Sequence, residues 1–341
     1  MKYFIRKIIY SALPILILLV GINYIGDAAK IFNKKYEKEI SKIILDGNFV
    51  TNITNYDDRI LQRELIKGMS QPPQLLILGS SRTMLINSSY FSNQNIFNNS
   101  VSGASMEDIV AILNIYKTYH HSYPSKIIIG IDPWLFNENN GQNRWKSIAS
   151  FYEPRDRINI NSLYKYKQLL SLSYFQASLK TLPDVLAKNS RPLITKIKYN
   201  QTNTKLNDGS LVYGESFRNA TQNDIDAKID HFIIGNIYSL GNFNVISEKL
   251  WSEFESLVKN LKTSNVQVEF FLAPYPPKVY DKVSIDYPNV LKTESQIEEF
   301  AMNNKIKIYG TFNPYKLGFD NTYFYDGMHC KENGIREILN N

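Results

Sequence analysis

Residues 75–82, with the sequence LLILGSSR, constrain the fold of this chain more than any other stretch. Four consecutive apolar residues after two prolines are typical of a strand in a parallel sheet, because both faces of such a sheet are covered. Gly79 permits a sharp turn at the carboxyl end of this strand, where open α/β sheets bind their ligands. The serines that follow, Ser80 and Ser81, are candidates for a nucleophile, and the N-cap of the next helix is the alternative.

Strand patterns of the same kind alternate with helical patterns along the chain. A short second strand begins near residue 95, and three further strands are predicted over residues 126–131, 266–272 and 306–309. Amphipathic helices are expected over residues 106–119, 247–261 and 290–303. Strands that alternate with helices predict an α/β fold with a doubly wound, flavodoxin-like parallel sheet of five strands.

A long interruption, residues 136–245, lacks this alternation. We predict a mostly helical insertion, with one helix over residues 162–182, that forms a cap over the active edge of the sheet. Five of its side chains are candidates for sugar stacking and anion contacts, with a place in the hydrophobic core as the alternative for the aromatic ones: Arg144, Trp145, Phe151, Tyr164 and Tyr166.

The amino terminus carries a long uncharged segment, residues 8–25, behind a short basic tail of residues 1–7. Its length predicts an N-terminal transmembrane helix that acts as a signal anchor, and a cleaved signal peptide is the alternative. Residues 26–73 then form a juxtamembrane stalk and leading helix, and the α/β domain covers residues 74–341. Lysines follow the segment as well as precede it, so charge alone leaves its orientation open.

Composition excludes several classes of protein. The only cysteine among 341 residues is Cys330, so the chain forms no internal disulfide and no paired-cysteine metal site. The net charge of +7 favours anionic partners, with ordinary solubility as the alternative reading. The basic residues are dispersed and no nucleic-acid-binding module is recognisable, so we expect no nucleic-acid partner. We also expect no metal and no cofactor.

A second motif, Asp326-Gly327-Met328-His329, lies near the carboxyl terminus. An aspartate three residues before a histidine can curl back so that its carboxylate reaches Nδ1 while Nε2 faces outward, which prepares a general base. The other histidines lack such a partner: two lie between a helix and a strand, and one lies in the insertion.

These motifs together resemble the SGNH or GDSL-type hydrolases, and in particular their membrane-anchored branch that acts on cell-envelope polymers. The resemblance covers residue 74 to the carboxyl terminus without the insertion. It implies a Ser-His-Asp triad with Ser81 as nucleophile, His329 as base and Asp326 as its orienter. It also implies that the amides of Ser81 and Gly103 form the oxyanion hole.

The resemblance further implies a serine esterase or O-acyltransferase that moves an acyl group, such as acetyl, through an acyl-serine intermediate. The substrate would be a cell-envelope or exported polysaccharide. The catalytic domain would then lie on the extracytoplasmic side of the cell membrane, beside a multi-spanning membrane acyltransferase that supplies the acyl group.

The chain departs from the family at one position. After the third strand the family has Gly-x-Asn, whose amide donates to the oxyanion, whereas this chain has Gly130-Ile131-Asp132. An ionised carboxylate only accepts hydrogen bonds. Candidate replacements or substrate contacts are Arg82, Asn98, Asn99, Asp132 itself, Trp134 and Trp145, and pairing of Asp132 with Arg82 is the alternative. A catalytically weak or inactive glycan-binding module, or a membrane scaffold, is the competing functional class.

Overall fold

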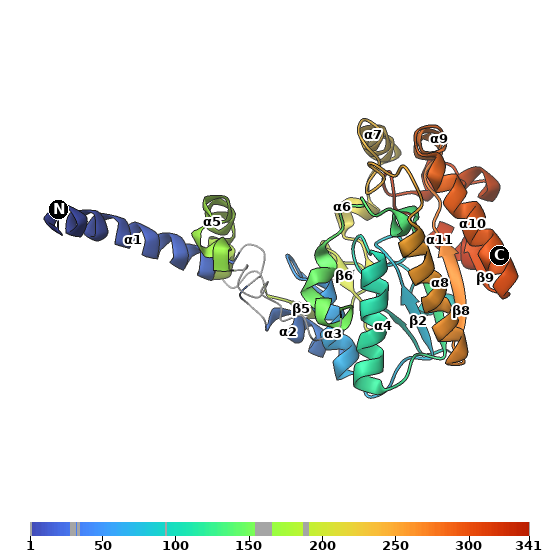
Figure 1. Cartoon of the computed structure of the whole chain (residues 1–341), viewed down its shortest axis with the longest axis horizontal. Coiled ribbons are helices and arrows are strands. Elements are labelled where there is room, and N and C mark those ends of the chain that lie inside the picture. The colour runs from blue at the N-terminus through green and yellow to red at the C-terminus, as the bar shows by residue number, and fades with distance from the viewer. Residues whose placement is uncertain are drawn as a thin grey trace.

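The computed structural model of the chain describes residues 2–27, 32, 35–92, 94–153, 166–186 and 191–340. An α/β body occupies one end of the molecule, and helix α1 (Lys2–Gly26) extends away from it, with helix α5 (Leu172–Leu186) lying across its inner end (Figure 1). The amino terminus therefore lies far from the body, whereas the carboxyl terminus lies on it.

A five-stranded sheet forms the centre of the body, and all of its strand pairs are parallel. Its order is β3-β2-β4-β8-β9, the flavodoxin-like order that was predicted. The predicted strand positions differ from the observed ones by a residue or two at the ends. The strands are β2 (Leu75–Leu78), β3 (Ile96–Asn98), β4 (Lys126–Gly130), β8 (Gln267–Leu272) and β9 (Lys307–Gly310).

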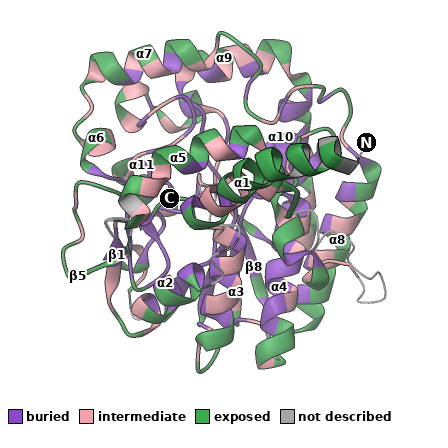
Figure 2. Ribbon diagram, turned by 90° about the vertical axis from the view of Figure 1, so that its left-hand side faces the viewer, coloured by how far each residue is buried: buried purple, intermediate pink, exposed green. Residues whose placement is uncertain are grey.

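Both faces of this sheet are covered. On one face Leu76, Ile127 and Phe270 share a hydrophobic core with residues of the main covering helices. On the other face Leu75, Ile77 and neighbouring strand residues pack against the carboxyl-terminal helix. This explains why β2 reads as an uninterrupted apolar run, and Figure 2 shows the buried residues gathered around the sheet. The helices are α4 (Met106–His120), α8 (Glu248–Thr263), α9 (Pro277–Asp286), α10 (Pro288–Asn304) and α11 (Glu332–Asn340).

A second, antiparallel sheet was not predicted. Strand β1 (Phe49–Thr51) pairs with β5 (Leu193–Thr195) and β6 (Thr204–Lys205), and β6 pairs with β7 (Leu211–Val212). The mostly helical insertion was therefore predicted incompletely, since it supplies three strands along with α5, α6 (Glu215–Arg218) and α7 (Gln222–Phe232).

Residues 26–73 were predicted to form a stalk and leading helix, and the structure shows two helices and a strand within them. Helices α2 (Tyr36–Leu45) and α3 (Asp58–Gly68) pack on each other and on β1 around a core of their own, which includes Ile40, Val50 and Leu61. The buried apolar face of these helices explains the helical spacing seen in the sequence.

Short 3₁₀ helices complete the described structure: η1 (Ser88–Tyr90), η2 (Pro133–Phe136), η3 (Arg144–Phe151), η5 (Pro314–Leu317) and η6 (Asn321–Tyr323). The helix predicted over residues 162–182 falls partly outside the described residues, and its later part lies in α5.

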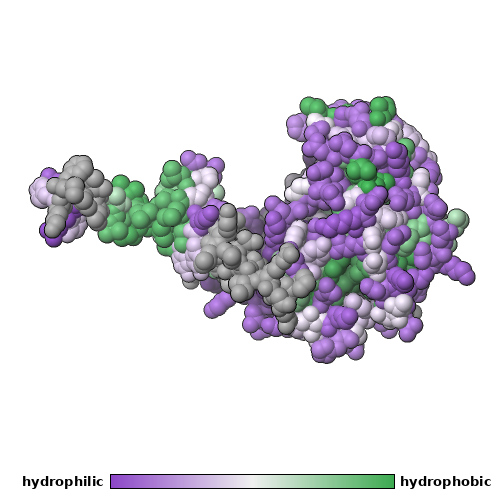
Figure 3. Space-filling view, viewed as in Figure 1, coloured by the Kyte–Doolittle hydropathy of each residue, from purple (hydrophilic) through white to green (hydrophobic). Residues whose placement is uncertain are grey.

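Polar contacts join helix α1 to helix α5 and to the residues just before α5. The Asn23 side-chain amide donates to the carbonyl oxygens of residues 168, 169 and 171, and the Thr181 hydroxyl donates to the Gly26 carbonyl. Apolar side chains remain exposed on both helices, which form the hydrophobic end of the molecule in Figure 3. Residues 8–25 lie within α1. In the described parts of the chain, we find no helix with both the length and the apolar character that crossing a membrane requires.

Candidate active site

Ser81 lies just beyond the carboxyl end of β2, in a turn that requires glycine at position 79. Gly79 adopts φ +150°, and a Cβ atom there would lie 2.7 Å from the Thr83 hydroxyl oxygen and 3.1 Å from the Cα of Gly130. Such contacts are too short for any side chain, so the turn can approach the neighbouring strand β4 only with glycine at this position. The turn leaves Ser81 partly exposed, whereas Ser80 is fully buried.

Ser81, His329 and Asp326 form a continuous chain of hydrogen bonds. His329 Nε2 lies 2.9 Å from Ser81 Oγ, and His329 Nδ1 lies 2.9 Å from Asp326 Oδ2. Because an ionised carboxylate accepts only, Nδ1 carries the ring proton of the neutral histidine and Nε2 accepts from the serine hydroxyl. This arrangement has the geometry that general-base activation of a serine needs.

The Asp326 carboxylate is held in its ionised form. Burial alone would raise its pKa, but the hydrogen bond and charge of His329, together with the main-chain amides of Met328 and His329, outweigh burial and lower the pKa below its usual range. The carboxylate therefore stays charged at neutral pH and fixes the orientation of the imidazole.

The main-chain amides of Ser81 and Gly103 are the candidate donors of the oxyanion hole. Within the described residues, neither the Ser81 N–H nor the Gly103 N–H donates a hydrogen bond to a protein group. The loop of Gly103 is tied to the serine turn, since the Val101 amide donates to the Gly79 carbonyl at 2.9 Å. Free amides beside a nucleophile are the groups that stabilise an oxyanion.

The loop around Gly103 is fixed from three sides. The Ser102 amide donates to Asp58, the Ala104 carbonyl accepts from the indole of Trp134, and the buried Arg59 donates to the Gly103 carbonyl at 3.5 Å. Gly103 itself has φ +57°. This conformation favours glycine at position 103.

Asp132 and Arg82 pair with each other beneath the serine turn. Arg82 Nη1 lies 3.0 Å from Asp132 Oδ1, and both side chains are almost fully buried. Arg82 Nη2 donates to the carbonyls of residues 273 and 274, and its guanidinium carbon lies 4.1 Å from the ring centroid of Tyr275. Burial raises the pKa of Asp132, and the charge of Arg82 opposes this shift. The alternative that Asp132 pairs with Arg82 is therefore the observed arrangement.

Three candidate substrate contacts from the sequence have buried side chains. Trp134 is 0 % exposed, since η2 turns it into the core. Asn99 is 0 % exposed, with its amide donating to Gln62 and its carbonyl accepting from Tyr116. Arg82 is 2 % exposed and is held by Asp132 and two carbonyls, and its buried Nε has no hydrogen-bond partner among the described residues.

The remaining candidates are less constrained. Trp145 is half-buried and packs edge-on against Tyr152. Phe151 is half-buried beside Tyr119, Tyr166 is exposed, and Tyr164 lies outside the described residues. Asn98 is buried and donates to the carbonyls of Thr83 and Ile86. None of these contacts joins the hydrogen-bond chain of Ser81.

One side chain beside His329 was not identified from the sequence. The ring of Tyr213, which directly follows β7 of the insertion, lies edge-on to the His329 ring at 5.9 Å and also to Tyr325. Tyr213 is buried, and burial raises the pKa of its hydroxyl. The insertion thus helps to position the histidine through the second sheet, a contact that depends on pairing between distant segments.

The described residues form an α/β protein with a Ser-His-Asp hydrogen-bond chain at the carboxyl edge of its parallel sheet. They bring together no group of three or more His, Cys, Asp or Glu side chains that could hold a metal ion. No family model matches the chain, and no curated protein matches it in sequence.

Proposed function

We propose that this protein is a serine esterase or O-acyltransferase of the SGNH type. The observation that carries the proposal is the hydrogen-bond chain from Asp326 through His329 to Ser81. The amides of Ser81 and Gly103 donate to no protein group among the described residues, so they are available to an oxyanion. A half-buried aspartate, an oriented imidazole and a partly exposed hydroxyl are the groups that nucleophilic acyl transfer uses.

The reaction follows from this geometry. His329 Nε2 takes the Ser81 proton while Ser81 Oγ forms a bond to the ester carbonyl carbon, and the amides of Ser81 and Gly103 donate to the oxygen that becomes negative. His329 then gives the proton to the alcohol that leaves. Water or a glycan hydroxyl attacks the acyl-serine in the second half, and its proton returns through His329 to Ser81 Oγ.

The pairing of Asp132 with Arg82 supports activity in spite of the departure from the family pattern. An unpaired carboxylate near the oxyanion would oppose the developing negative charge. Here the carboxylate accepts from a buried guanidinium and from the Ser80 hydroxyl. The site therefore lacks the asparagine donor without gaining a free negative charge, and loss of one such donor costs about 10²-fold in rate.

The first experiment is hydrolysis of 4-nitrophenyl acetate by the full chain. We expect a burst of nitrophenol equivalent to the enzyme, followed by slower turnover, because the acyl-serine forms before it is resolved. Adding an acetyl-free polysaccharide with free hydroxyls separates the two activities: a transferase acetylates the glycan, whereas an esterase releases acetate. A rate no greater than that of a Ser81→Ala variant would refute the proposal.

We further propose that α1 and α5 place the protein at a membrane, with the body on the extracytoplasmic side where polysaccharide substrates lie. The support is the exposed apolar surface of Ile15, Ile17 and Leu18 on α1 and of Leu172 on α5. Apolar surface of this extent is unfavourable in water. The full chain should float with phospholipid vesicles in a density gradient, and a chain that stays at the bottom of the gradient would contradict this placement.

A further inference from the structure

A polar cluster from the insertion lies directly against Gly103. A Cβ atom at residue 103 would lie 2.5 Å from Arg144 Nη2 and 2.9 Å from Gln142 Oε1, and it would also collide with the hydroxyl of Tyr238. These three side chains, which we call the Arg144 cluster, therefore touch the residue whose free amide belongs to the proposed oxyanion hole. They come from two loops that are about a hundred residues apart in sequence.

The two loops are tied together by side-chain amides. Gln142 Nε2 donates to Tyr238 Oη at 2.9 Å and to Ser239 Oγ at 2.7 Å. The buried Asn137 donates to the carbonyls of residues 239 and 241. The ring of Tyr238 also packs edge-on against the buried Trp134, at 5.6 Å between centroids. These contacts fix the position of the Arg144 cluster.

Hydrogen bonding within the cluster leaves donors facing outward. The Tyr238 oxygen accepts from Gln142 and, at 3.3 Å, from Arg144 Nη2. Both lone pairs of this oxygen are then used, so its own proton is free to donate. Arg144 Nη2 has a second neutral acceptor, Gln142 Oε1, at 3.4 Å.

Arg144 carries a positive charge that the described protein does not neutralise. Its side chain is exposed, and no carboxylate of the described residues lies within ion-pair distance of it. A guanidinium, a free tyrosine proton and the Gly103 amide offer donors, and the acceptor beside them, Gln142 Oε1, already accepts from Arg144. Such a set fits an anion, and a guanidinium in particular binds carboxylate or phosphate through paired hydrogen bonds.

We propose that Arg144, assisted by Tyr238, binds a carboxylate or phosphate group of the substrate next to the ester that Ser81 attacks. The inference rests on the proposed function and narrows its substrate class to acylated anionic polysaccharides, such as those with uronic acid or sugar phosphate residues. Arg144 is a substrate-binding residue in this account, and the chemistry at Ser81 is unchanged.

Two acetylated polymers test this preference: acetylated polygalacturonate, which carries carboxylates, and acetylated xylan without uronic acid, which is neutral. Arg144→Gln should lower kcat/KM for the anionic polymer at least about tenfold more than for the neutral one, mainly through KM, because a hydrogen bond to a charged group is lost. Arg144→Lys should restore part of the preference for the anionic polymer, since lysine keeps the positive charge but cannot form the paired hydrogen bonds of a guanidinium.

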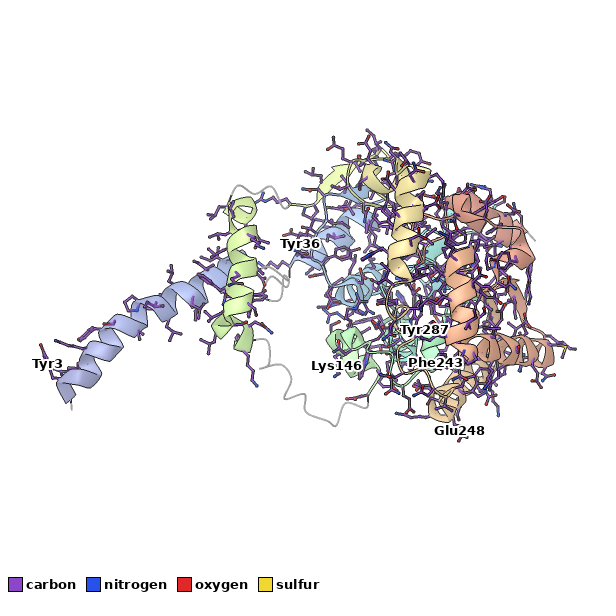
Figure 4. All side chains as sticks on the ribbon, turned by 90° about the horizontal axis from the view of Figure 1, so that it is seen from above. Tyr3, Tyr36, Lys146, Phe243, Glu248 and Tyr287 are labelled. Carbon is purple, nitrogen blue, oxygen red and sulfur yellow. The ribbon has the colours of Figure 1, made fainter. Side chains whose placement is uncertain are left out.

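Lys146 provides the matched control. It is an exposed basic residue on the same short helix, η3, and Figure 4 labels it on the surface of the body. Lys146→Gln removes the same charge two residues away and should leave the ratio of the two rates unchanged. If Arg144→Gln and Lys146→Gln change the ratio equally, or Arg144→Gln leaves it unchanged, the inference is wrong.

The two anion types are distinguished by direct binding, which does not depend on catalysis. Galacturonate oligomers and sugar phosphates are titrated separately into the full chain by calorimetry. The anion that Arg144 recognises should bind to the wild type and to Lys146→Gln and lose most of its affinity in Arg144→Gln. If no ester is hydrolysed but this binding pattern holds, the proposed function fails and the anion site stands. If esters are hydrolysed and neither anion depends on Arg144, the anion site fails alone.

Discussion

Replacing Ser81 by alanine is expected to lower kcat for ester hydrolysis by about 10⁴-fold or more, and His329→Ala should have a similar effect. Both side chains share one hydrogen bond of 2.9 Å, and each is useless for nucleophilic attack without the other. The Ser81→Ala/His329→Ala double variant should therefore be hardly slower than either single variant, because residues that act as a unit have strongly non-additive effects.

Asp326→Asn extends this series. The Asp326 carboxylate accepts from His329 Nδ1 and from two main-chain amides, so an asparagine at this position would favour the wrong tautomer of the imidazole. We expect a loss of about 10³- to 10⁴-fold in kcat. If the fold-losses in kcat of the three single variants multiply when the substitutions are combined, these residues do not act as one unit.

The second large effect concerns the stability of the fold. Arg82→Met and Asp132→Leu should each lower the free energy of unfolding by about 3–5 kcal/mol, because each leaves a buried charge without its partner. The double variant should lose less free energy of unfolding than the two single variants lose together, since it removes both charges. Urea denaturation of the four proteins measures this coupling.

An exposed ion pair serves as the control. Lys316 and Glu298 lie 3.7 Å apart, and both are about half exposed. Lys316→Met should change the free energy of unfolding by less than about 1 kcal/mol. If Arg82→Met lowers the free energy of unfolding as little as Lys316→Met does, the buried ion pair does not stabilise the serine turn.

Much of the central sheet could be predicted from the sequence. Strand β2 consists of four consecutive apolar residues, and β4 and β8 each contain an apolar run, residues 127–129 and 270–272, because both faces of the sheet are buried. The motif of Asp326 and His329 was also local, since a carboxylate three residues before an imidazole can reach it within one turn of chain.

The second sheet had no comparable signal. Its strands are two or three residues long, and the pairing of Val50 with Ile194 and Lys205 joins segments that lie more than a hundred residues apart. No period develops over so few residues, and register between distant segments depends on the whole fold. The contact of Tyr213 with His329 was therefore also beyond sequence analysis.

Side-chain direction explains the remaining differences at the site. Trp134 follows β4 just as a substrate-binding residue would, but the 3₁₀ helix η2 directs its ring into the core. The sequence left the role of Asp132 open, with pairing to Arg82 as one alternative, because that bond depends on the turn after β2 and the strand β4 being neighbours in the sheet. Such contacts are set by tertiary packing rather than by local spacing.

Reaction with a fluorophosphonate, followed by peptide mapping, tests the central claim most directly. This reagent modifies a serine only where a base activates its hydroxyl and free main-chain amides donate hydrogen bonds to the phosphonyl oxygen. We predict modification of the wild type at Ser81, none in Ser81→Ala or His329→Ala, and retained modification in Ser80→Ala, in which the buried neighbouring hydroxyl is removed. Modification at another residue, or equal modification of the wild type and Ser81→Ala, would contradict the account.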